Sequence, residues 1–364
     1  MTAQAPTLAI PDAQGALSLE RYDDLNAIRD EWTALAEDCG NPFATWEWAA
    51  TWWDHFGEDR KLQITACRRP DGTLAAILPL YLSTRGPLRM ARFVGHGVGD
   101  VLGPIYAKED AALAASGVQQ TLAESVRSWD LLLAERMPKD RFPGLLRGEV
   151  FQEEANPFLP INGASWDDFL ASCSSNMRGQ IRRKRRKLER EHGSRFRLAD
   201  DPERLDADFD TLVSLHGARW GDARAFSERR SAFHRAFAAR ALEQGWLRLW
   251  LLEVDDQAVA AWLGFRFGNV EWYYQSGRNP AWDQQSVGLI LLARTIQGAF
   301  DDGMSAYAFL RGDEEYKRRF ATEDAGLETV GIARGPLGHA AVSAACAAKR
   351  LPPGARHRVL RSLG

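Results

Sequence analysis

The residues best suited to chemistry lie near the C-terminus, where a short apolar run gives way to acidic residues. Residues 309–320 read FLRGDEEYKRRF. Ligand sites in α/β sheets favour the position just beyond the carboxyl end of a strand. Asp313, Glu314 or Glu315 could there accept a proton from an amine, and Tyr316 could donate one to a leaving thiolate. The alternative is a capped helix with acids at its positive end.

A second chemical feature is a polar loop that leads into an expected helix. Residues 281–289 read AWDQQSVGL. A helix that starts after such a loop presents free backbone N–H groups and the positive end of its dipole, which suits a pyrophosphate. Gly288 would let a phosphate approach the backbone closely. The alternative is that Ser286 is an ordinary N-cap and Gly288 a packing glycine.

Other sequence motifs give weaker indications of a chemical function. Residues 95–100 read GHGVGD and resemble a dinucleotide loop, but Asp100 replaces the third glycine and no helix follows. His216 shares a helical face with Trp220, which favours a structural histidine over a base. The sequence contains no HExxH, GxSxG or Walker A motif, and its four cysteines form no CxxC pair. Metal and serine-hydrolase chemistry are therefore not indicated.

Hydrophobic periodicity predicts the elements that would position these residues. The N-terminal half is expected to run strand, two helices, three antiparallel strands, helix and strand, at residues 17–20, 23–38, 46–56, 62–67, 74–82, 92–94, 108–128 and 129–134. The C-terminal half is expected to repeat this order with longer pieces, at residues 166–170, 176–192, 196–198, 205–220, 226–244, 247–254, 259–267, 270–276, 286–300, 307–310, 314–320 and 327–332. The repeated order predicts an α/β (α+β) chain with two similar halves.

The bulk properties are those of a two-domain globular protein. The chain has 364 residues, of which 45% are hydrophobic and 26% charged, with a net charge of -3. This balance does not indicate nucleic acid or an anionic membrane as partner. No signal peptide or run of about 18 apolar residues is recognisable, so we expect a cytoplasmic protein without a membrane span.

The domain boundary is expected where prolines interrupt the pattern between residues 151 and 166. We therefore expect a flexible leader at 1–16, an N-terminal domain at 17–155, a C-terminal domain at 156–335 and a tail at 336–364.

Several motifs in fixed order resemble the bacterial CelD/BcsL-type acetyltransferases of the GNAT (acyl-CoA N-acyltransferase) superfamily. They are YYxSG at 273–277, SxGLIL at 286–291 and FLxGDExYK at 309–317. The N-terminal half agrees through NPF at 41–43 with Trp46 and Trp48, and through SNxR at 175–178. The sequence departs from the family pattern at Ala308, where relatives often have Asp, and it lacks the full Arg/Gln-x-x-Gly-x-Gly/Ala loop of standard GNAT enzymes.

The resemblance implies two tandem GNAT-like domains, each a mixed, mostly antiparallel sheet flanked by helices. It implies an acyl-CoA-dependent N-acyltransferase that uses acetyl-CoA or another acyl-CoA, without a metal, and acts on an amine of a small molecule, amino sugar or envelope precursor. Its catalytic candidates are Asp313, Glu314 and Tyr316. Its candidates for binding the acyl-CoA are Tyr274, Gln275, Ser276, Gln284, Gln285, Ser286, Val287, Gly288 and Lys317. Its candidates for binding the acceptor are Trp46, His96, Asp100, Arg178 and Tyr273.

The expected helix at 176–192 is strongly basic and leaves two other functions open. It carries Arg178, Arg182, Arg183, Lys184, Arg185, Arg186, Lys187 and Arg190. This run could contact the 3′-phosphate of CoA, an acidic glycan or lipid, or RNA, or it could be a solvated arm. Fem-type peptidyltransferases share the doubled architecture and use charged tRNA, so a tRNA-dependent transferase is one alternative. A non-catalytic binding module on a degenerate GNAT scaffold is the other.

Overall fold

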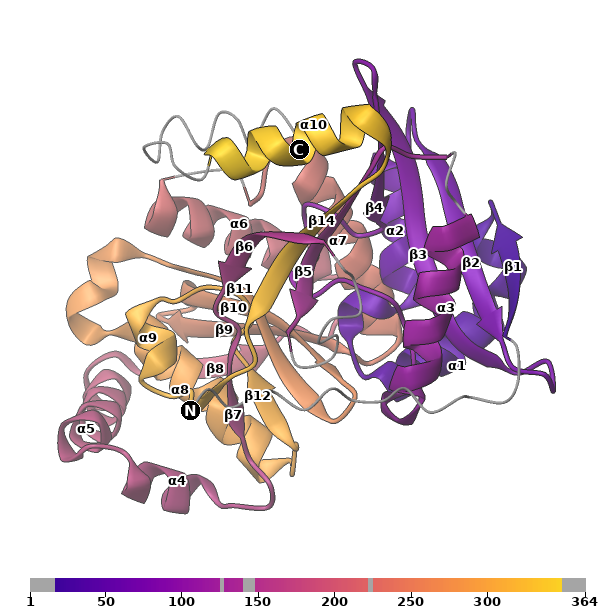
Figure 1. The fold of residues 1–364 in the computed structure, drawn as a ribbon. Helices are drawn as coiled ribbons and strands as arrows, with labels where there is room; N and C mark the ends of the chain where they lie inside the picture. The colour runs from indigo at the N-terminus through magenta and orange to yellow at the C-terminus, as the bar shows by residue number, and fades with distance from the viewer. Residues whose placement is uncertain (1–16, 125–127, 140–147, 222–224, 349–364) are drawn as a thin grey trace.

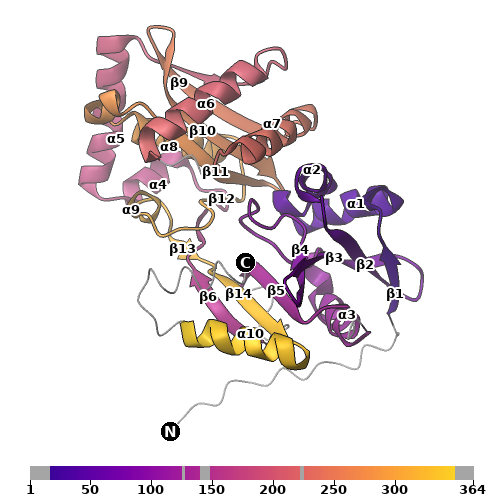
Figure 2. The same ribbon diagram turned by 90° about the horizontal axis from the view of Figure 1, so that it is seen from above.

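The protein consists of two similar α/β halves, as the sequence predicts. The computed structural model describes residues 17–124, 128–139, 148–221 and 225–348. Each half contains a seven-stranded, mostly antiparallel sheet flanked by helices (Figures 1 and 2). The strand orders are β1-β2-β3-β4-β5-β14-β6 in the first sheet and β13-β7-β12-β11-β10-β9-β8 in the second. Within these residues, no helix has the length and apolar character needed to cross a bilayer.

The first half follows the expected order closely. Its strands are β1 (Ser18–Tyr22), β2 (Lys61–Arg68), β3 (Leu74–Arg85), β4 (Leu88–Phe93), β5 (Leu131–Pro138) and β6 (Glu149–Glu154), and its helices are α1 (Arg29–Cys39), α2 (Trp46–Phe56) and α3 (Ala111–Glu124). Thr45 caps α2 by accepting a hydrogen bond from the Trp48 amide, as its position before the apolar run predicts.

The second half begins with β7 (Pro157–Pro160). Its further strands are β8 (Arg195–Leu198), β9 (Leu247–Val254), β10 (Gln257–Phe267), β11 (Val270–Arg278), β12 (Ala306–Ala308) and β13 (Glu323–Asp324). Its helices are α4 (Trp166–Ser172), α5 (Ser175–His192), α6 (Leu205–Trp220), α7 (Glu228–Glu243), α8 (Val287–Asp301) and α9 (Glu315–Arg318), and β14 (Leu327–Ala333) and α10 (Gly335–Ala348) follow.

One strand lies in a different half from the one expected. β14 falls within the range 156–335 assigned to the C-terminal domain, but it pairs with β5 and β6 in the first sheet. Leu327 and Val330 of this strand are buried, so pairing there satisfies the backbone of β14 and covers its apolar face. The sequence pattern does not predict strands β6 and β7, because both are short and lie at or within the proline-interrupted segment between 151 and 166.

A shared core joins the two halves. Trp48 of α2 is fully buried and makes edge contacts with Phe233 and Phe237 of α7, with ring centroids 5.0 and 4.7 Å apart. Its ring centroid also lies 6.0 Å from that of Tyr274 in β11. Apolar burial of this extent is the main stabilising term in folding. The halves are therefore expected to keep a fixed relative position.

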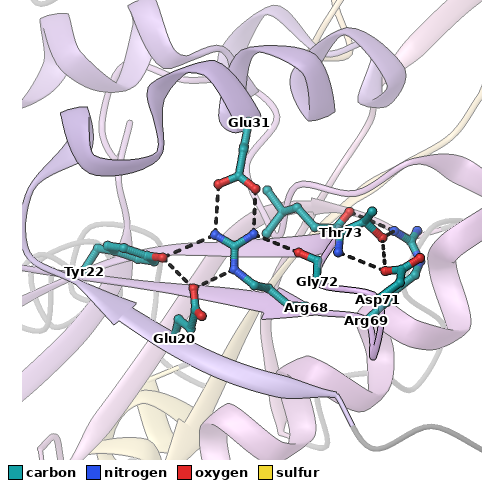
Figure 3. Close-up of polar contacts among 9 residues, drawn as sticks. Glu20, Tyr22, Glu31, Arg68, Arg69, Asp71, Gly72 and Thr73 are labelled. Atoms are coloured by element: carbon teal, nitrogen blue, oxygen red, sulfur yellow. Dashed lines mark hydrogen bonds and ion pairs between the residues drawn. The ribbon is translucent and has the colours of Figure 1, made fainter.

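A polar network fastens the edge of the first sheet. Figure 3 shows Arg68 of β2 between Glu20 and Tyr22 of β1 and Glu31 of α1. The guanidinium donates to both carboxylate oxygens of Glu31, at 2.6 and 2.9 Å. The Arg68 hydrogen bond lowers the pKa of Glu31, so this carboxylate is charged at neutral pH. The network thereby ties β1, β2 and α1 together.

Each sheet contains one short parallel strand pair. β4 pairs with β5 over three residues, Met90–Arg92, and β11 pairs with β12 over three residues, Val270–Trp272. Beyond Trp272, β11 continues against β10 while the chain after β12 turns toward β7 through the Phe309 amide and the Pro157 carbonyl. The second sheet therefore splays beside Tyr273–Arg278.

Candidate functional site

A cavity of about 410 Å³ lies between β10, β11 and the start of α8, and we call it the α8 cavity. Its lining combines backbone of the open strand, apolar side chains and arginines: Arg219, Ala260, Ala261, Trp262, Tyr273, Ser276, Gly277, Arg278, Asp283, Ser286, Gly288, Leu289, Leu291, Leu292, Tyr316 and Arg319. Concave, mostly apolar sites with a few convergent polar groups are typical of small-ligand binding.

The first turn of α8 faces this cavity with free donors. Ser286 has a left-handed backbone with φ of 61°, and its side chain caps none of the described amides of α8. The first intrahelical bond runs from the Ile290 amide to the Ser286 carbonyl, so the three preceding amides are left for other partners. The alternative of an ordinary serine N-cap is therefore wrong.

Gly288 leaves space at this helix end. A Cβ atom there would meet Arg278 Cδ at 3.2 Å and no other described heavy atom within 4 Å. Arg278 Nε donates to Asp283 at 2.7 Å, which places a guanidinium beside the helix terminus. Sequence reasoning missed Arg278 of β11, Arg219 of α6 and Arg319, which follows α9; all three guanidinium-bearing residues line the cavity. Free amides together with arginines form a setting suited to phosphate groups.

A smaller cavity of about 160 Å³ adjoins the first and lies between the halves; we call it the interface cavity. Its lining residues are Asp100, His216, Trp220, Tyr273, Tyr274, Gln275, Ser276, Phe309, Leu310, Arg311, Glu314, Tyr316 and Lys317. Tyr273, Ser276 and Tyr316 line both cavities. A ligand in one cavity could therefore meet a ligand in the other at these three hydroxyl groups.

The three hydroxyls form a hydrogen-bonded chain. Tyr316 donates to the Tyr273 oxygen at 3.1 Å, and the Tyr273 oxygen lies 2.5 Å from Ser276 Oγ. Arg219 of α6 donates to Ser276 Oγ at 2.7 Å. Burial raises the pKa of Tyr316 far above its usual range, so this phenol stays protonated and can act as a donor.

A β-bulge brings Tyr273 and Ser276 together. Successive side chains on a regular strand alternate between faces, so residues three apart would lie on opposite faces. The register of β10 against β11 shifts at Leu263 and Gly264, which leaves Tyr274 as the extra residue. Tyr273 and Ser276 therefore share one face, while the Tyr274 hydroxyl points the other way and donates to the Val98 carbonyl at 2.8 Å.

The neighbouring acids Asp313 and Glu314 have different surroundings. Asp313 is exposed, receives two hydrogen bonds from Arg318 that lower its pKa, and lines neither cavity. Glu314 lines the interface cavity, and its carboxylate lies 3.0 Å from Lys317 Nζ. Of these two candidates, Glu314 is the one placed near the hydroxyl chain.

Lys317 does not line the α8 cavity, and contacts within the fold fix its position. Its ammonium group is buried and donates to the Arg311 carbonyl at 2.6 Å, with Leu310 at 3.5 Å. Leu310 itself has a left-handed backbone with φ of 57°. Lys317 thus holds the strained turn that carries Glu314, on the interface side of the site.

The loop before α8 places its glutamines beside the basic helix. Gln284 and Gln285 end a 3₁₀ helix at Pro280–Gln285, and Lys184 of α5 donates to the Gln284 carbonyl. The Gln285 Oε1 atom is buried and accepts no hydrogen bond from the described residues. Val287 is fully buried and anchors the start of α8.

The N-terminal half contributes Asp100 to the interface cavity. Its carboxylate lies 3.0 Å from the Arg311 guanidinium, which joins the two halves at the site. His96 lies deeper in the first half, within hydrogen-bonding distance of Tyr81 and Arg92, and burial lowers its pKa well below the usual value. His96 is therefore neutral, and it lines neither cavity.

Two further predicted residues lie away from both cavities. Trp46 is buried and donates through Nε1 to the Leu25 carbonyl at 3.1 Å. Arg178 donates to the carbonyls of Ala171 and Cys173 at 2.6 and 2.7 Å, so it closes the end of α4. Trp46 therefore packs in the core, and Arg178 caps a helix end.

A family model described as Acetyltransferase (GNAT) domain matches residues 175–318. The match spans α5 to α9 and includes the open strand β11, the start of α8 and the hydroxyl chain. Over these residues the C-terminal half is similar to GNAT acetyltransferase domains, which supports acyltransferase as the enzyme class. A search of curated proteins found no match.

Solved structures resemble most of the chain in fold. FemX has a TM-score of 0.61 at 13% identity, over 85% of this chain and 96% of that chain. The C-terminal domain (DUF2156) of a putative lysylphosphatidylglycerol synthetase from Agrobacterium fabrum has a TM-score of 0.56 at 11% identity, over 88% and 96%. L-PGS from Bacillus licheniformis has a TM-score of 0.50 at 13% identity, over 84% and 91%. At these identities the likeness shows the doubled fold alone.

Proposed function

We propose that the protein is an acyl-CoA-dependent N-acyltransferase in which the α8 cavity takes the acyl-CoA and the interface cavity takes the amine. The observation that carries this proposal is the junction of the two cavities at Tyr273, Ser276 and Tyr316. The free amides at the start of α8, together with Arg278, suit the pyrophosphate. The open strand beside Tyr273–Arg278 leaves room for the pantetheine arm and thioester.

Each group then has a role in direct acyl transfer. Glu314 accepts the proton of the attacking amine, directly or through a water. A backbone N–H of the open strand between Tyr273 and Ser276 polarises the thioester carbonyl, a contribution of about 3 kcal/mol to transition-state stabilisation. The hydroxyl chain supplies the proton to the leaving thiolate. The acceptor that we propose is the one that the sequence resemblance implies: an amine of a small molecule, an amino sugar or an envelope precursor.

The test is the thermal stability of the protein with acetyl-CoA. At a concentration 100 times the dissociation constant, binding should add about 2.7 kcal/mol to the free energy of unfolding and raise the melting temperature. Gly288→Glu should abolish this shift, because its side chain fills the space beside the free amides and repels phosphate. Gly298→Glu is the matched control on the same helix, since a Cβ there meets only the end of the flexible Arg294 side chain among described atoms.

The control should keep the full shift. No shift with acetyl-CoA or any longer acyl-CoA in the unaltered protein would refute the proposal. An equal loss in both glycine variants would mean that α8 is damaged rather than that a phosphate site is blocked.

The basic helix α5 supports a second candidate, a tRNA-dependent transferase. α5 packs at the outer edge of the C-terminal half (Figures 1 and 2), and its exposed cations include Arg182, Arg183, Arg185 and Arg186. Exposed arginines that neutralise phosphates give salt-dependent binding of nucleic acid. This candidate requires a salt-sensitive complex with tRNA that is lost when these four arginines are replaced by glutamine. It fails if the purified protein ignores tRNA at low salt.

A further inference from the structure

The hydroxyl chain between the cavities contains one proton more than its internal bonds use. Three hydroxyls, on Tyr316, Tyr273 and Ser276, supply three protons, and two hydrogen bonds join them in a row. One proton is therefore free to be donated to a ligand. Which oxygen carries that proton decides which residue can protonate the leaving thiolate.

Arg219 makes Ser276 a hydrogen-bond acceptor at one end of the chain. A guanidinium has donors and no acceptor, so Ser276 Oγ must accept the hydrogen bond from Arg219 at 2.7 Å. At the other end, Tyr316 donates to Tyr273. The geometry of the 2.5 Å contact between Tyr273 and Ser276 allows either oxygen to donate; we take Tyr273 as the donor, because a phenol is a stronger acid than an aliphatic hydroxyl. Ser276 Oγ then accepts two hydrogen bonds, and its own proton is the free one.

We propose that Ser276, rather than Tyr316, is the catalytic hydroxyl that protonates the leaving thiolate, and that Arg219 is a positioning residue that orients the chain toward it. This inference rests on the proposed function. Ser276 lines the α8 cavity, where the thioester would lie, and all three residues of the chain border the interface cavity as well. The arrangement connects the amine side of the site with the thiol side.

The proton balance closes without any other reactant. The amine nitrogen forms a bond to the carbonyl carbon, the carbon–sulfur bond breaks, and its electron pair goes to sulfur. Ser276 gives its proton to sulfur, Tyr273 gives one to Ser276, and Tyr316 gives one to Tyr273. Tyr316 regains a proton from Glu314, which holds the proton lost by the amine. The net result is transfer of one proton from nitrogen to sulfur.

The protonation state of Tyr316 is consistent with this direction. Burial is the main cause that raises the pKa of this phenol, and the neighbouring Tyr273 adds to it. A phenolate at Tyr316 is therefore costly and short-lived, which favours its rapid reprotonation from the interface cavity. The Arg219 guanidinium also lies over the Tyr316 ring, 5.4 Å from its centroid, and so contacts both ends of the chain.

The experiment measures the ionisation of the CoA thiol bound to the protein, through thiolate absorbance against pH. It needs no acceptor. A donor aimed at sulfur stabilises the thiolate and lowers the pKa of the bound thiol. Ser276→Ala should raise that pKa by about one unit relative to the unaltered protein. Tyr316→Phe should leave it nearly unchanged, because Tyr273 still donates to Ser276 and the Ser276 proton stays free.

Two more variants separate positioning from packing. Arg219→Met removes the donor that fixes the chain, so the thiol pKa should rise toward the value of Ser276→Ala. Ser276→Thr keeps the hydroxyl and should restore the value of the unaltered protein. If the role of Ser276 were only structural, a hydroxyl at this position would not by itself restore the pKa of the bound thiol.

The opposite pattern would overturn the inference. If Tyr316→Phe raises the thiol pKa and Ser276→Ala does not, Tyr316 donates to sulfur directly. If neither variant changes it, the chain does not touch sulfur. A protein that does not bind CoA at all, as judged by calorimetry, would instead refute the proposed function, so the two failures are distinguishable.

Discussion

At the scale of single residues, the site depends on which side chains are free to meet a ligand. Asp313 and Glu314 are adjacent acids in the sequence, but Arg318 occupies both oxygens of Asp313 while Glu314 lines the interface cavity. A carboxylate already held in an exposed ion pair outside the cavity is poorly placed to accept a proton from a substrate amine. The structure therefore separates two candidates that residue type alone leaves equal.

Replacement of these acids by their amides provides a matched pair of variants. Glu314→Gln should lower the rate of thiol release from acetyl-CoA, in the presence of a panel of primary amines, by about 100-fold or more. Asp313→Asn should change that rate by no more than a few-fold, because it removes a surface ion pair of small energetic value. Equal losses in the two variants, or a larger loss for Asp313→Asn, would contradict the role given to Glu314.

At the scale of elements, helix α6 must lie close to β11 for Arg219 to reach Ser276. Gly277 makes this approach possible, because a Cβ atom there would overlap the backbone of Leu215 and His216. The contact fixes the distance between the helix and the strand that carries the hydroxyl chain. The same glycine lines the α8 cavity, so packing and site geometry depend on one position.

Substitution of this glycine tests the contact. Gly277→Ala should lower the free energy of unfolding by about 2 kcal/mol, since the backbone of α6 must shift to admit a methyl group. Gly179→Ala is the control: it lies within α5 with open space around it and should stabilise the protein by about 1 kcal/mol. Denaturant unfolding of both variants measures the difference. A harmless Gly277→Ala substitution would mean that α6 does not pack on β11 as described.

The elements themselves could largely be predicted from periodicity, while their partners could not. The bounds of α2, α6 and β9 agree with those expected, because each is a long apolar pattern with clear ends. The bulge at Tyr274 has no signal in a single sequence, and without it Tyr273 and Ser276 would be assigned to opposite faces. The role of Arg219 could not be predicted for the same reason, because it depends on a hydrogen bond to Ser276, 57 positions away in the sequence.

At the scale of the whole molecule, the site requires both halves. Asp100 comes from the first half and pairs with Arg311 of the second, and the Tyr274 hydroxyl is held by the Val98 carbonyl across the same boundary. Strand β14 returns from the second half to complete the first sheet. Repeated element order predicted two halves, but only pairing over long sequence separations shows how they interlock.

The most direct measurement of the central claim is a crystal structure of the protein soaked with CoA. The account predicts density for the diphosphate at the amides that begin α8, next to Gly288 and Arg278, and for the sulfur within hydrogen-bonding distance of Ser276. Density for CoA bound elsewhere, such as along α5, or a well-ordered α8 cavity that stays without CoA at saturating concentration, would contradict it.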